Sequence, residues 1–91
     1  MEPQGFLVVA KSMPRFFFDT CEDGNIVPDQ EGMELRDLET AKKEALNSLA
    51  DLARDAVRTS TMKREFSVTV RDGQGNGIVK TVLIFDIVPS G

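Results

Sequence analysis

Residues 37–58 constrain the fold more than any other segment, because apolar residues recur there every three or four positions. Asp37 suits the N-cap of a helix, since its carboxylate can accept a hydrogen bond from a free amide of the first turn. Arg54 and Arg58 suit the negative end of the helix dipole. We therefore expect one long helix, with these residues on its buried face: Leu38, Ala41, Ala45, Leu49, Leu52, Ala53 and Ala56.

The spacing changes from helical to alternating after the helix. Apolar residues occupy every second position over 66–70, which predicts a half-buried strand. Three glycines in residues 72–77 then predict a reversal of the chain. A last strand is expected over residues 78–88, apolar on both faces, in which Val82 and Ile84 share one face.

Upstream of the helix, residues 15–19 read as a strand that contains three consecutive phenylalanines. Phe17 must point away from the face that its two neighbours share. A turn and two short extended pieces, 26–27 and 33–35, lead to the helix. The sequence thus predicts an α+β domain of ββαββ order, with a small antiparallel or mixed sheet and one long helix packed on one face. The domain spans 13–91, and residues 1–12 form an N-terminal appendage or an extra edge strand.

Length and charge limit the classes of function. Ninety-one residues make one domain, and the net charge of −4 makes binding to nucleic acid unlikely. A single cysteine cannot form an internal disulfide, which favours a reducing, cytoplasmic location. No apolar run approaches the ~20 residues that span a bilayer, so no membrane partner is expected.

Three motifs follow one another in the chain: Met-Pro-Arg-Phe-Phe-Phe from Met13, an Asp-Gln-Glu-Gly turn from Asp29 and an Asp-Leu-Glu-Thr-Ala helix start from Asp37. In this order they resemble a bacterial family of short proteins described as a domain of unknown function. The resemblance covers Met13 to about Val88 and implies no activity. The acidic Gly-containing turn and the Leu-Glu-Thr-Ala segment are also similar, more distantly, to antitoxins of the HicB type.

No residue pattern indicates catalysis, a metal or a cofactor. The chain contains no histidine, the usual base at neutral pH and the commonest metal ligand. Cys21 is followed by two acidic residues, which oppose thiolate formation. The acidic segment after it places Pro28 where a calcium loop needs glycine. The glycine-rich segment 72–77 joins two strands, so it reads as a hairpin loop and not as a phosphate cradle.

One helix covers only one face of a sheet, and three apolar residues are expected on the other: Phe17, Val82 and Ile84. If they cluster, they form an interaction face of the kind that marks a partner surface. We expect a homodimer or another protein partner and no small-molecule ligand. In the alternative arrangement, Phe6 to Val9 fold over that face. The alternative function is an antitoxin-like or regulatory module that binds a protein or RNA.

Overall fold

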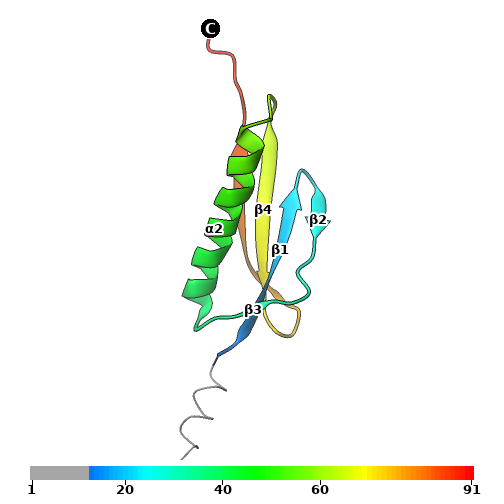
Figure 1. Ribbon diagram of the computed structural model, residues 1–91, viewed down its shortest axis with the longest axis vertical. Helices are drawn as coiled ribbons and strands as arrows, with labels where there is room; N and C mark the ends of the chain where they lie inside the picture. The colour runs from blue at the N-terminus through cyan, green and yellow to red at the C-terminus, as the bar shows by residue number, and fades with distance from the viewer. Residues whose placement is uncertain (1–12) are drawn as a thin grey trace, which may run out of the picture.

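The computed structural model describes residues 13–91 as an antiparallel sheet with one helix across one face (Figure 1). The sheet order is β2-β1-β4-β5, and β3 pairs with the other end of β1. The elements are β1 (Arg15–Glu22), β2 (Asn25–Val27), β3 (Met33–Glu34), α2 (Leu38–Val57), β4 (Arg64–Arg71) and β5 (Gly77–Phe85). Every pairing among these strands is antiparallel. The predicted α+β class is therefore confirmed. The predictions for residues 1–12, including a cover formed by Phe6 to Val9, lie outside the described residues.

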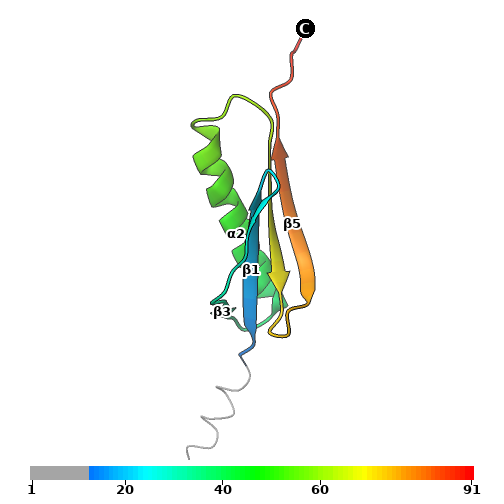
Figure 2. The same ribbon diagram turned by 90° about the vertical axis from the view of Figure 1, so that its right-hand side faces the viewer.

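The helix begins and ends where its caps predict. Asp37 is the N-cap, and its Oδ1 accepts a hydrogen bond from the backbone N–H of Thr40 at 2.9 Å. Arg58 is the C-cap. Figure 2 shows α2 packed against one side of the sheet. The helix lies over β4 and β5, whereas β1 and β2 extend the sheet to the right of it in Figure 1.

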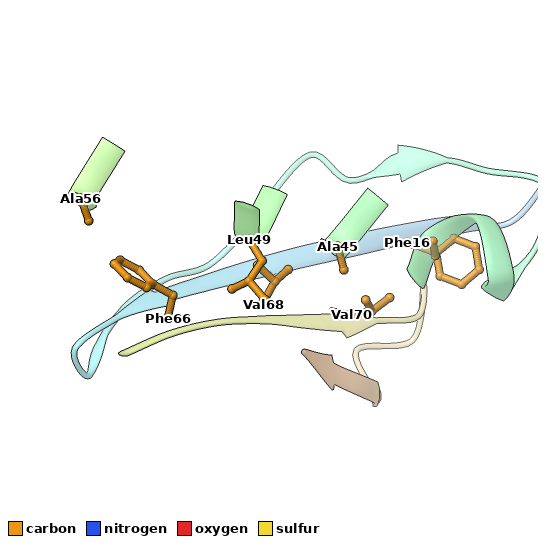
Figure 3. Close-up of a cluster of buried hydrophobic side chains, with 8 residues drawn as sticks. Phe16, Ala45, Leu49, Ala56, Phe66, Val68 and Val70 are labelled. Carbon is orange, nitrogen blue, oxygen red and sulfur yellow. The ribbon is translucent and has the colours of Figure 1, made fainter. Parts of the chain in front are cut away.

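The core lies between α2 and the central strand β4. Phe66, Val68 and Val70 of β4 are fully buried, and they face Ala56, Leu49 and Ala45 of the helix (Figure 3). In that view Ala56 lies over Phe66 and Ala45 over Val70. Because alanine has no side chain beyond Cβ, the helix can approach the strand closely while β4 supplies the bulk. Leu49 is the one large side chain among the four buried helix residues, so the helix side of the core is mostly alanine and the strand side is bulky.

Two strands end three residues away from their predicted ends. β5 ends at Phe85 and not at Val88, because its partner strand β4 begins at Arg64, the residue opposite Phe85. The backbone beyond Phe85 therefore has no neighbour to pair with in this sheet. In contrast, β1 continues past Asp19 to Glu22, because β2 on one side and β4 on the other both pair with its second half.

The pairing of β1 with β4 joins distant parts of the chain. Arg71 and Asp19, which contact each other across this pair, are 52 positions apart in the sequence. The pairing of β4 with β5 is local, since a tight loop connects the two strands. In that loop the Asp72 carboxylate accepts the backbone N–H groups of Gln74 and Asn76, each at 2.9 Å.

Candidate interaction surface

The face of the sheet opposite α2 is polar in the middle and apolar at its margins. Its central residues, Cys21, Ser67 and Thr69, are small, and they border a hollow of about 160 Å³. Ser67 is only 7% exposed, although the helix does not cover this face. Ile26 of β2 borders the hollow on one side, and Lys80 of β5 borders it on the other.

Val82 and Ile84 lie together at the β5 side of this open face. They are 51% and 52% exposed, and they stand opposite Ser67 and Glu65 of β4. Among the described residues no strand pairs with the outer edge of β5. We call Val82, Ile84 and the adjoining outer edge of β5 the β5 margin. The structure thus brings together two of the three residues expected at an interaction face.

Phe17 lies apart from Val82 and Ile84. It stands opposite Arg71 of β4, whereas Val82 stands opposite Ser67, four residues away along the same strand. At ~3.3 Å per residue this separation is about 13 Å along the strand. Polar residues occupy the rows between them, with Asp19 and Lys80 on either side of Thr69. The sequence gives the face of each strand residue but not the register, so this separation could not be predicted.

The Phe17 ring is covered by its own domain. The Arg71 guanidinium lies over it, 5.1 Å from the ring centroid. Gly32 lies against it as well: a Cβ built on Gly32 would meet the ring at 2.8 Å and the carbonyl oxygen of Phe16 at 2.9 Å. Gly32 also has φ of +71°, a conformation that side chains rarely adopt. Glycine is therefore needed here for both space and backbone conformation.

Hydrogen bonds among Arg71, Asp19 and Asp29 hold the loop before β3 against the sheet. Arg71 donates to both carboxylate oxygens of Asp19, from Nε at 2.7 Å and from Nη2 at 3.1 Å. Its Nη2 also donates to the backbone carbonyl of Asp29 at 3.0 Å. The backbone N–H of Asp29 in turn donates to Asp19 at 2.9 Å. The bidentate pair of Arg71 and Asp19 fixes the orientation of the two side chains as well as their distance. We call Asp19, Asp29, Arg71 and Gly32 the loop clamp.

The Asp29 carboxylate completes the loop clamp by accepting backbone donors. It accepts the N–H groups of Phe18 at 3.1 Å, Glu31 at 3.1 Å and Gly32 at 3.2 Å. The Asp-Gln-Glu-Gly motif thus makes its contacts within the domain and fixes the conformation of its own loop. Aspartate satisfies the amides of a tight loop, and glycine lets that loop lie against an aromatic ring.

Both clamp carboxyl groups are held in the ionised form. The hydrogen bonds from Arg71 lower the pKa of Asp19 below its ordinary value of 3.8, against the effect of burial. Burial alone would raise the pKa of Asp29, but the three backbone N–H groups together outweigh it and lower that pKa. A general acid at neutral pH needs the opposite shift. In this structure both carboxylates act as hydrogen-bond acceptors that hold the loop before β3.

The other acidic groups of the described residues do not gather as metal ligands, and two arginines of the sheet are paired with acids. In residues 13–91 no three Cys, Asp or Glu side chains converge as ligands for one ion. Arg64 is paired with Glu22 and Asp23, as Arg71 is with Asp19, so these two cations on the sheet are neutralised. In the same part of the chain, no helix combines the length and apolarity needed to cross a membrane.

Sequence reasoning missed the loop clamp, although its motif was visible. The signal was an aspartate three residues before a glycine, followed by an arginine near the end of a strand. Nothing in the sequence joined Arg71 to Asp29, because their contact depends on which strands are neighbours. The free edge of β5 was hidden for the same reason, since strand order decides which strand is last.

Comparison with known proteins assigns the chain to a family. Residues 15–83 match the family described as domain of unknown function DUF6894, and this match covers most of the chain. The protein belongs to that family. The matched residues include the loop clamp, Val82 and almost all of the sheet. Searches of curated proteins and of solved structures found no match.

Proposed function

We propose that this domain is a cytoplasmic protein-binding module that catalyses no reaction, and that it binds its partner through the β5 margin. The observation that carries the proposal is the pair of half-exposed residues Val82 and Ile84 beside a strand edge that has no neighbour among residues 13–91. A strand edge offers a row of backbone donors and acceptors, and an added strand from another protein can use them. The two apolar side chains supply contact area beside that row.

The distribution of charges supports binding over catalysis. The described aspartates with lowered pKa act as acceptors for backbone amides or arginine, which ties them to local structure. Cys21 lies in the middle of the open face, beside Ser67 and Thr69, and the basic residue that borders the same hollow, Lys80, lies two strands away on β5. A nucleophilic cysteine needs a positive neighbour or an adjacent base. The single cysteine also agrees with a reducing compartment.

A substitution pair tests the β5 margin. Val82→Asp introduces a charge into the proposed contact, and Ile26→Asp introduces the same charge on the same face at the opposite edge of the sheet. The molar mass of each variant is measured by light scattering after size exclusion. The proteins that each variant retains from an extract of the producing cells are compared quantitatively. We expect Val82→Asp to lose at least about tenfold in affinity for its partner, and Ile26→Asp to lose little.

The control measurement is the circular-dichroism spectrum, which must show unchanged helix in both variants. If a folded Val82→Asp keeps the mass and the bound proteins of the wild type, the β5 margin is not the binding surface. If both variants lose binding equally, the contact covers the whole open face and is not confined to β5. An antitoxin-like role would appear as stoichiometric binding of a basic protein, in place of self-association.

A further inference from the structure

We propose that the partner at the β5 margin is a second copy of this chain, with the two β5 strands paired antiparallel about Leu83. This inference rests on the proposed function, which leaves the identity of the partner open. In a twofold dimer the same strand of each copy meets itself, so residues equally far from the centre stand opposite each other. The two sheets then form one continuous sheet, with both helices on the same face.

The open-face residues around Leu83 are complementary to themselves. They are Lys80, Val82 and Ile84, and Asp86 follows directly after β5, where the strand alternation continued by one residue places it on the same face. Antiparallel pairing about Leu83 places Val82 opposite Ile84 of the second copy, and it does so twice. It also places Lys80 opposite Asp86 of the second copy at both ends. Cross-strand apolar pairs and opposite charges both stabilise a sheet.

Other registers lack this match. The open faces of the two copies lie on the same side of the joint sheet only if the twofold axis passes through a residue. A shift of the pairing by one position would place each open-face residue opposite a residue of the helix-covered face. An axis at Thr81 places Lys80 opposite Val82 of the second copy. An axis at Val82 places Lys80 opposite Ile84, and an axis at Ile84 places Val82 opposite Asp86. The Leu83 axis alone among these four pairs charge with charge and apolar with apolar.

Both charged residues are available for such a contact. Lys80 is an exposed residue of β5, and Asp86 is exposed directly after it. Within residues 13–91 neither side chain belongs to an ion pair, whereas Arg64 and Arg71 of the neighbouring strand are both paired. The Asp86 carboxylate accepts only a local hydrogen bond, from the backbone N–H of Ile87 at 2.8 Å. A partner's lysine can therefore reach it without breaking a contact between elements of the fold.

The helix provides a second, independent indication on the other face of the sheet. Leu52 and Asp55 border a hollow together with Glu22, so this flank of α2 is turned toward β1. The opposite flank carries Leu46 and Val57, which are 54% and 60% exposed. Helix geometry places Ala50 and Ala53 between these two. An apolar flank rich in alanine thus lies on the side of α2 away from β1, where β5 is the last strand.

Along the direction of the strands, this flank of α2 lies level with the proposed twofold axis at Leu83. Leu83 stands opposite Phe66 of β4, and Ala56 of the helix lies over Phe66 (Figure 3). The twofold axis therefore passes near the last turns of α2. Ala53 and Val57 of one copy would face the same residues of the other. Small side chains allow two helices to pack closely, at interaxial distances of about 8–10 Å.

Reversal of the two charges tests the register. Lys80→Glu places two acids opposite each other at both ends of the pairing, and Asp86→Lys places two bases there. We expect each single variant to raise the dimer dissociation constant by about tenfold or more, and the double variant to restore it to within about threefold. Lys63→Glu, which changes the net charge equally at an exposed site outside the sheet, should leave the constant unchanged. Sedimentation equilibrium at low and high salt supplies the constants.

Restoration by the double variant is the result that a merely unfolded single variant cannot produce. Single variants with wild-type dissociation constants, or a double variant as weak as either single one, overturn the Leu83 register. A wild-type chain that remains monomeric at about 0.1 mM overturns self-association. In that case binding of another protein that Val82→Asp abolishes still supports the proposed function. A dimer insensitive to Val82→Asp and to both charge reversals refutes the inference and the proposed function together.

Discussion

The two edges of the sheet contain similar residue types but use them differently. At one edge, β1 is flanked by the short strands β2 and β3 and by the loop that Arg71, Asp19 and Asp29 hold in place. At the other edge, β5 runs for nine residues, and among the described residues no strand pairs with its outer side. Exposed edges of this length are usually blocked by charge, proline or a bulge. β5 carries one lysine, Lys80, and an irregular register at Ile78 near its start, while residues 81–85 contain no charge, proline or bulge. The closed edge shows that this fold can cover a strand, and the open edge is the surface that we propose for binding.

The charged residues make the same distinction. Around the closed edge, arginine and aspartate contact each other within one chain, and Phe17 lies beneath them. Around the open edge, Lys80 of β5 and Asp86, directly after β5, stand on either side of two apolar residues, and neither charge is paired within residues 13–91. Internal pairing produces a fixed loop. Unpaired, alternating charge beside an apolar pair is what a complementary chain can recognise.

The largest expected effect on stability comes from the core between α2 and β4, which lies between the two edges of the sheet. Leu49→Ala should lower the free energy of unfolding by about 2–5 kcal/mol, because it leaves a cavity above the central strand β4. Asn47→Ala, at an exposed position of the same helix, should change it by less than about 0.5 kcal/mol. Urea unfolding followed by circular dichroism gives both values. Equal costs for the two variants would mean that the Leu49 side chain does not pack in the core.

A second variant acts on the closed edge alone. Gly32→Ala should cost about 1–3 kcal/mol, because the new methyl group meets the Phe17 ring and the residue has positive φ. Gly24→Ala is the matched control, since Gly24 has φ of +90° but open space around it. It should therefore cost less than Gly32→Ala. The molar mass of both variants should equal that of the wild type. A change of assembly in Gly32→Ala would contradict the division of roles between the two edges.

The smallest expected effect is a dependence of stability on pH. The pKa values of Asp19 and Asp29 are lower in the folded chain than the ordinary 3.8. The stability that they contribute is thus fully present above pH 3.8 and is lost as the pH falls through their folded pKa values. Urea midpoints of the wild type should fall over that range more steeply than those of Asp29→Asn. Parallel curves would show that Asp29 does not contribute in this way.

The sequence predicted the elements better than the relations between them. The helix from Leu38 to Val57, its Asp37 cap and the buried face of β4 followed from periodicity and capping, which act over a few residues. The end of β5 did not, because it depends on where its partner strand starts. The position of Phe17 did not either, since the residue that covers it comes from the far end of another strand.

For the candidate surface as well, the sequence predicted local features but not the relations between strands. Val82 and Ile84 were predicted to share a face, because strand periodicity alone decides that. Their separation from Phe17 by polar rows required the register of three strands. The open edge of β5 required the strand order. These are properties of tertiary pairing, and a single sequence without its relatives carries no direct record of them.

The pairing of β1 with β4 also has a consequence for the order of folding. The hairpin of β4 and β5 closes across a short loop, and α2 directly precedes it in the chain, so these three elements can form early. β1 must then join from a position 52 residues away in its contact with Arg71. Closing so long a segment costs chain entropy before any contact forms. We expect β1 to join the sheet last. The edge of β4 that pairs with β1 is then briefly exposed during each folding event.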